Sequence, residues 1–228
     1  MGSQKTVVNR YHFAGAVLDT AYTWNEENTG SSSAALGSDA DAVLTLEATD
    51  EAQCTALNFG GARFDIDRLR RVEIVAKVGT LAATEEIALG VYDAHDDDPD
   101  SVAVGALFRC DGTNAITLET DDGTNDVDDV AAGEDATADT YRRYVIDFAS
   151  GVRANDPRAG GNGGGKADVR FFVGNANGNL RAVGQSQIFD MSNYSGSLQP
   201  CLLIAKASGT GTTALSVREV IIELDESA

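Results

Sequence analysis

Apolar and polar residues alternate between residues 71 and 78, where every even-numbered position is apolar. Successive side chains of a β-strand point to opposite faces, so a period of two predicts a strand with one buried face and one wet face. The pattern returns in further segments: Ile87 to Val91, Tyr144 to Phe148, and Val169 to Val173. The chain is therefore expected to be built from β-strands.

The last third of the chain, residues 169–224, has the clearest succession of strands and turns. A strand leads into a turn rich in glycine and asparagine at 175–179, and a second strand returns from it. Two long strands then close the chain, joined by a Ser-, Thr- and Gly-rich loop at 208–212. Either parity of the first of these could face inward: Leu203 and Ala205, or Leu202 and Ile204.

The last strand changes its period part-way along. Its inward candidates fall into two parities: Leu215 and Val217, then Val220, Ile222 and Leu224. One extra residue in a strand restores a single inward face, so a β-bulge is expected near Arg218-Glu219.

Turn signals recur every 8–12 residues and predict about eight to ten short strands. Asp111-Gly112 indicates a hairpin, and the Thr113-Asn114 that follows predicts a loop longer than two residues. Residues 119–139 contain nine acidic residues and no basic one, and are expected to form an exposed loop. The fold class predicted is all-β, an antiparallel β-sandwich or jelly roll, with an irregular N-terminal arm.

Residues 1–40 are the least regular part of the chain and are interpreted as an N-terminal arm and loop, followed by a sandwich domain over 41–228. Aromatic residues without a clear period suggest that the arm packs on its own sandwich or on a neighbouring subunit. Residues 40–59 could be helix or strand.

The charge balance excludes one class of partner. The 228 residues carry a formal net charge of −19, which repels nucleic acid phosphates, so no nucleic acid is expected. No apolar run is long enough for a membrane span and the start lacks a secretory leader, so neither membrane nor export signal is predicted. The three cysteines, at 54, 110 and 201, lack metal-ligand spacing and are expected to be buried thiols.

No catalytic motif stands out, and the chain is predicted not to be an enzyme. Histidine occurs only as His12 and His95, and neither Gly-x-Ser-x-Gly nor Glu-x-Asp-x-x-Glu is present. The nearest carboxylate group, residues 223–226, lies at the C-terminus. The glycine run at 160–165 lacks the Ser or Thr of a phosphate-binding loop. No catalytic, cofactor-binding or metal-ligating residue is assigned, and no cofactor.

Calcium is the ion that the acidic loops fit best, since carboxylates are its preferred ligands. The candidates form two groups: Asp93, Asp96, Asp98 and Asp100, and Asp121, Asp122, Asn125, Asp126 and Asp128. Neither matches the EF-hand pattern, and solvated aspartates explain them as well. Trp24, Tyr92, Tyr141 and Tyr194 could stack on sugars or could simply pack in the rim and core.

Three segments resemble the concanavalin A-like (laminin-G-like) jelly-roll sandwich: Val169 to Asn175, Ser197-Leu198-Gln199-Pro200 with the strand after it, and Leu215 to Leu224. The likeness spans roughly residues 60–225 and extends to virion proteins of tailed phages. It implies a capsid decoration protein on the virion surface, bound to the major capsid protein and to copies of itself. The alternative is a calcium-assisted, lectin-like module that binds surface glycans.

Overall fold

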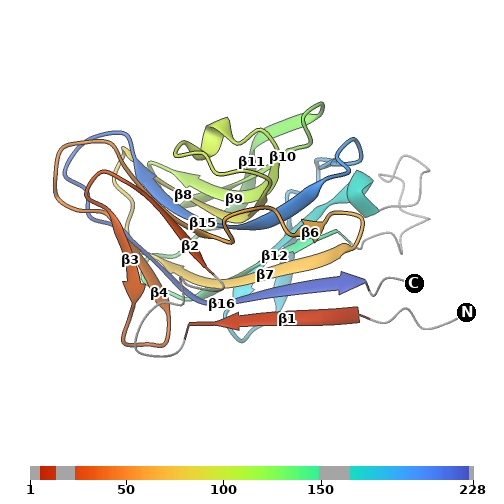
Figure 1. Cartoon of the computed structure of the whole chain (residues 1–228), viewed down its shortest axis with the longest axis horizontal. Helices are drawn as coiled ribbons and strands as arrows, with labels where there is room; N and C mark the ends of the chain where they lie inside the picture. The colour runs from red at the N-terminus through yellow and green to blue at the C-terminus, as the bar shows by residue number, and fades with distance from the viewer. Residues whose placement is uncertain (1–5, 14–23, 149–164, 226–228) are drawn as a thin grey trace, which may run out of the picture.

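The computed structural model describes residues 6–13, 24–148 and 165–225, and it consists of two antiparallel sheets packed face to face (Figure 1). Sixteen strands are present in these ranges, more than the eight to ten expected. Several of the additional ones are short, such as β6 (Phe64–Asp65), whereas β11 (Asp126–Asp135) is a ten-residue strand in a segment expected to be a loop. The all-β sandwich predicted from the alternation is confirmed.

The first sheet, sheet A, has the strand order β14-β13-β12-β7-β16-β4-β3, and β1 also pairs with β16. Its strands are β1 (Thr6–His12), β3 (Ser33–Leu36), β4 (Ala42–Thr45), β7 (Leu69–Val78), β12 (Arg142–Asp147), β13 (Arg170–Asn175), β14 (Leu180–Val183) and β16 (Ala214–Asp225). Strands distant in sequence, such as β7 and β16, are therefore neighbours.

The second sheet, sheet B, has the order β11-β10-β9-β8-β15-β5-β2, and β6 pairs with β15. Its other strands are β2 (Asn25–Thr29), β5 (Gln53–Asn58), β8 (Glu85–Tyr92), β9 (Gly105–Asp111), β10 (Ala115–Asp121), β11 (Asp126–Asp135) and β15 (Ser197–Lys206). Two short 3₁₀ helices complete the described chain: η1 (Pro99–Ser101) and η3 (Gly165–Asp168).

The main core lies between the sheets and contains the residues that the alternation placed inward. Val72, Ile74, Ala76 and Val78 of β7 are at most 1% exposed. Aromatic rings join the two layers, because Phe108 of sheet B meets Tyr144 and Phe171 of sheet A edge to face, with centroids 5.3 and 5.1 Å apart.

A second hydrophobic cluster covers part of the outer face of sheet B. It contains Cys54, Ala56, Ala88, Tyr92, Val102, Leu107, Cys201, Leu203 and Ala205. Val102 lies in the β8–β9 connection, which runs over these strands and includes η1. Strand β15 is consequently buried on both faces, which is why its sequence showed no single inward parity.

The predicted bulge in the last strand is confirmed. The register of β16 against β7 shifts between Val217 and Glu219, and Leu215, Val217, Val220 and Ile222 are all fully buried. The first part of β16 pairs with β4 and the part after the shift pairs with β1. The Asp111-Gly112 hairpin also has its longer loop, with Gly112 at a φ of 60°.

The acidic segment 119–139 is not one exposed loop, which corrects the expectation. Residues 126–135 form β11, an edge strand paired with β10. Val127 and Val130 pack on the core while the carboxylates face outward, and charged edges of this kind discourage pairing with other chains. Packing of these two valines on the core is enough to make the segment a strand, although its composition is typical of a loop.

Strands β1, β2 and β3 lie within residues 1–40 and pair with β16, β5 and β4. The division into an arm of 1–40 and a domain of 41–228 stays a prediction. The ambiguous segment 40–59 forms strands β4 and β5. The glycine run at 160–164 lies outside the described residues, and none of the described helices is long and apolar enough to cross a membrane.

Candidate functional site

The outer face of sheet B, away from the main core, gathers charged side chains from several strands. Alternation along β8, β9 and β10 places Ile87, Phe108 and Leu118 in the main core and turns Glu86, Arg109 and Glu119 outward. Acidic residues therefore lie on strand faces as well as in loops.

Arg109 lies at the centre of a group of four carboxylates. Its guanidinium lies 2.5 Å from Asp100 and 2.8 Å from Glu119, and 3.6 Å from both Glu86 and Asp128. The Arg109 side chain is 4% exposed, so these contacts are made largely out of water. One guanidinium cannot balance four carboxylates, which leaves an excess of negative charge on this face.

The two most buried carboxyl groups respond to that excess. Burial raises the pKa of Glu86 to about 7, helped by the negative charge of Asp98 and opposed by Arg109. Burial also raises the pKa of Glu119 to about 7, against the attraction of Arg109. Both groups are therefore poised to exchange a proton near neutral pH, which is typical of functional sites and also occurs in structural networks.

A cavity of about 280 Å³ opens beside this cluster, between the β8–β9 connection and strands β2, β5 and β15. Its lining combines apolar side chains, among them Ala52, Ala205 and Ala207, with polar and charged ones: Thr29, Gln53, Glu86, Asp96, Asp97, Asp98 and Lys206. Lys206 is 2% exposed, and its ammonium donates to the carbonyls of Glu47, Thr49 and Gly211. The lysine is thus occupied by backbone oxygens, and the carboxylates set the charge of the cavity.

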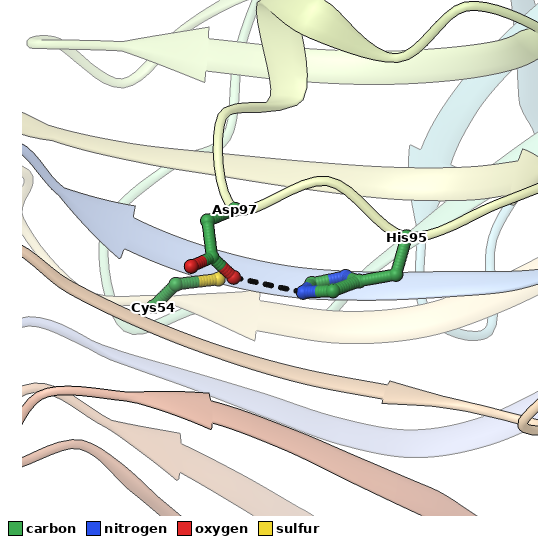
Figure 2. A group of neighbouring side chains, drawn as sticks. All are labelled: Cys54, His95 and Asp97. Carbon is green, nitrogen blue, oxygen red and sulfur yellow. Dashed lines mark hydrogen bonds and ion pairs between the residues drawn. The ribbon is translucent and has the colours of Figure 1, made fainter.

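Cys54, His95 and Asp97 meet at the edge of this cavity. Figure 2 shows Cys54 rising from β5 toward His95 and Asp97, which lie on the connection above the sheet. His95 Nε2 is 2.9 Å from Asp97 Oδ1, and the Cys54 thiol is a hydrogen-bond partner of the same carboxylate. The spacing in sequence gave no signal, because Cys54 and His95 are 41 positions apart and only pairing of β5 within sheet B joins them.

The aspartates predicted to suit calcium mostly serve the loops in which they occur. Asp96 and Asp98 each accept a backbone N–H two residues ahead, and Asp98 caps η1. Asp93 accepts from Ala94 N, while Asp100 binds Arg109. The structure does not bring these four together as one ligand set.

The second predicted calcium group is likewise divided. Asp122 accepts hydrogen bonds from the backbone of Thr124, Asn125 and Asn193, which ties two loops together. Asp121 accepts from Gly123 N, and Asp128 faces Arg109 from β11. A calcium ion among Asp100, Glu119 and Asp128, whose oxygens do lie close together, would have to share them with the guanidinium.

The aromatic residues considered for sugar stacking are engaged elsewhere. Trp24 is 4% exposed and packs with Tyr11, Phe13 and Phe59, and Tyr92 is fully buried. Tyr141 lies under the guanidinium of Arg218, 3.7 Å from the ring centroid. All three cysteines are buried, as predicted, and carry free thiols.

A second cavity, on the outer face of sheet A, is lined by alternating charges. It is bordered by Arg10, Arg71, Arg143 and Arg218 and by Glu73, Glu219 and Glu223. Arg71 and Arg143 both pair with Glu73, at 2.9 and 2.8 Å, and Arg10 pairs with Glu219. His12, the other histidine, also contacts Glu219, at 3.4 Å. These charges largely satisfy one another, so this face is the weaker candidate.

No family model matches the sequence, and no curated protein sequence does. Solved structures, in contrast, match along almost the entire chain. The catalytic domain of an endo-1,3-beta-glucanase (laminarinase) from Thermotoga petrophila RKU-1 has a TM-score of 0.61 at 12% identity, covering 99% of this chain and 100% of that one. Peanut lectin has a TM-score of 0.60 at 11% identity, covering 98% and 99%.

A third neighbour, lectin UEA-II complexed with galactose, has a TM-score of 0.59 at 8% identity and covers 98% of this chain and 100% of its own. The protein has the fold of a concanavalin A-like jelly-roll sandwich. The likeness inferred from the last third of the chain is therefore confirmed, whereas the likeness to phage capsid decoration proteins is not. At these identities the matches establish the fold of this concanavalin A-like sandwich and nothing finer.

The comparison also corrects the prediction that the chain is not an enzyme. The same sandwich forms the catalytic domain of an endo-1,3-beta-glucanase over its full length. Lack of a recognisable sequence motif was the basis of that prediction, and a concanavalin A-like sandwich can bring carboxylates from separate strands together without one. Glu86 and Glu119, 33 positions apart in sequence, are brought to the same guanidinium here.

Proposed function

We propose that this protein is a lectin-like carbohydrate-binding protein and that its sugar site is the cavity on the outer face of sheet B. The observation that carries the proposal is the cavity lining, which brings several carboxylates together in one pocket. Sugar hydroxyls donate hydrogen bonds, and charged acceptors are the stronger partners for them. The fold shared with two lectins supports the same function, and the virion role has no comparable support.

The test is a glycan array followed by calorimetric titration of the best glycan. Above pH 7, where the Glu86 carboxyl is ionised, we expect Glu86→Gln to weaken that binding about tenfold or more, since a hydrogen bond to a charged group contributes about 1.5–3 kcal/mol. Glu223→Gln, on the outer face of sheet A, is the matched control and should bind like the original chain. No glycan bound by the original chain, or equal loss in both variants, would refute the proposed site.

Calcium assistance stays a prediction. The hydrogen bonds that the loop aspartates already accept within their own loops compete with calcium for the same oxygens. The same titration run in EDTA and in millimolar calcium decides it. Equal affinity in the two buffers would remove calcium from the proposal while leaving the sugar site intact.

Glycoside hydrolysis is a second candidate, favoured by one observation. Glu86, with a pKa raised to about 7, lines the same cavity as Asp98, whose negative charge contributes to that shift. A protonated carboxyl beside a second carboxylate is the arrangement that glycosidases use as acid and base or nucleophile. Release of reducing ends from a β-1,3-glucan, abolished in Glu86→Gln, would establish hydrolysis; binding without release would leave the lectin function.

A further inference from the structure

The Cys54, His95 and Asp97 side chains form a compact set of three different donor atoms. Their sulfur, nitrogen and oxygen atoms all lie within 4.8 Å of one another (Figure 2). In tetrahedral zinc sites, with zinc–sulfur bonds of about 2.3 Å and zinc–nitrogen bonds of about 2.0 Å, donors lie roughly 3.3–3.8 Å apart. We propose that these three residues bind a thiophilic divalent cation, for which Zn²⁺ is the best fit.

Neighbouring side chains already orient two of the three donors. Thr29 of β2 donates to Asp97 Oδ2 at 2.5 Å, which leaves Oδ1 directed at His95. The Tyr92 hydroxyl lies 3.5 Å from His95 Nδ1 and accepts a hydrogen bond from Asn58. Histidines that bind metal through one ring nitrogen commonly hold the other in such a contact, which fixes the ring.

The charge around the set favours a cation over a reactive thiol. Burial raises the pKa of the Cys54 thiol, and the negative charge of Asp97 raises it further. A cysteine nucleophile needs the opposite influence, and the thiol here contacts the carboxylate rather than the imidazole. A divalent ion reverses this balance, because it stabilises the thiolate and is itself attracted by Asp96, Asp98 and Glu86 in the adjoining cavity.

Solvent can deliver the ion and complete its coordination. The Asp97 side chain is 51% exposed and that of His95 is 18% exposed, so the site is reached from outside. Cys54 and Asp97 also line the cavity, so a fourth position faces open space that water or a ligand can fill. Three protein ligands with one open position are the pattern of catalytic rather than purely structural zinc sites.

Binding has a defined proton balance. The Cys54 thiol loses its proton to the medium as sulfur bonds to the metal, and His95 Nε2 binds with its lone pair while Nδ1 carries the ring proton toward Tyr92. No oxidant or reductant takes part. Metal binding at these three residues is independent of glycan binding, so it is measured with the metal alone.

The experiment titrates the EDTA-treated and desalted full-length protein with Co²⁺, a spectroscopic substitute for Zn²⁺. We expect one Co²⁺ per chain, a sulfur-to-cobalt charge-transfer band in the near ultraviolet, and loss of both signals after one equivalent of Zn²⁺. Binding should release about one proton per metal in weakly buffered solution. Calcium in excess should not displace the cobalt, since the thiolate selects softer ions.

Matched variants locate the site. Cys54→Ser should abolish the charge-transfer band, because it removes the sulfur ligand. Asp97→Asn should weaken cobalt binding about tenfold or more, because it removes the charged carboxylate ligand. Cys110→Ser and His12→Ala, which alter the same residue types elsewhere, should keep the band. Circular dichroism confirms that each variant is folded. A silent spectrum in the original chain, or an unchanged band in Cys54→Ser and unchanged affinity in Asp97→Asn, would overturn the proposal.

Discussion

Arg109 shows how a single residue sets the chemistry of its surroundings. Asp100 and Asp128, whose side chains are 56% and 47% exposed, keep much of their hydration. Glu86 and Glu119 are 20% and 7% exposed and depend on the guanidinium instead. Because one cation is shared, the excess negative charge is relieved by protonating the two buried carboxyls, whose pKa values are raised to about 7.

Stability should consequently decline as the pH rises. In the folded protein the pKa of such a carboxyl is higher than its ordinary value of 4.5, which applies to the unfolded chain. Its protonated form therefore stabilises the fold, and this stabilisation is complete when the pH is below 4.5. The contribution is lost as the pH rises toward about 7, where the folded state gives up its proton. We expect chemical denaturation to show a fall of about 3 kcal/mol for each of the two carboxyls over this window, because each tenfold difference in proton affinity between the folded and unfolded states corresponds to about 1.36 kcal/mol.

Glu119→Gln should reduce that fall, because an amide cannot titrate. Glu47→Gln is the control, since Glu47 is exposed and lies outside the Arg109 group. A slope with pH that is the same in all three proteins would show that other groups govern it.

Strand β15 shows what burial on both faces means for an element. Leu202 faces the main core and is fully buried, and Leu203 faces the second cluster and is 1% exposed. A strand with one wet face would place one of the two in solvent. The β8–β9 connection covers the other face and gives β15 a role in both clusters.

Both leucines of β15 should therefore be costly to truncate. We expect Leu202→Ala and Leu203→Ala each to lower the free energy of unfolding by about 2–5 kcal/mol, as is usual for leucine in a packed interior. Ile188→Ala, at a side chain that is 42% exposed, should cost less than about 0.5 kcal/mol. A mild effect of Leu203→Ala in urea denaturation would mean that the connection does not cover the sheet in solution.

The molecule as a whole carries a net charge of −19 on 228 residues. Its ion pairs engage arginines on the outer faces of both sheets, but carboxylates outnumber basic residues 36 to 17. Long-range repulsion among the unmatched carboxylates therefore opposes the compact state, and salt screens it.

Raising the sodium chloride concentration should increase the thermal stability. Between about 0.01 M and about 0.3 M the Debye length falls from about 30 Å to below 10 Å, and we expect the melting temperature to rise by several degrees. Differential scanning calorimetry measures it, with sucrose at matched osmolality as the control for non-ionic effects. A falling melting temperature would show that the local ion pairs, such as those of Arg109, outweigh the net repulsion.

Local pattern determined much of this fold. Period-two alternation located the strands around Val72, Leu89 and Phe171, and the change of parity after Val217 located the bulge. These features follow from the strand geometry of neighbouring residues, which a sequence displays directly. The same reasoning failed for β11, where a few modestly apolar positions were enough to pair an acidic segment with β10.

Tertiary structure alone decided the site. Cys54, Glu86, His95 and Arg109 come from separate strands and a connection, and pairing through β5, β15, β8 and β9 brings them to one face. No local spacing records such a meeting, because register across a sheet depends on partners far along the chain. The sequence by itself therefore determined the sandwich and its buried faces, while the arrangement of charge, cavity and candidate metal ligands depended on which strands became neighbours.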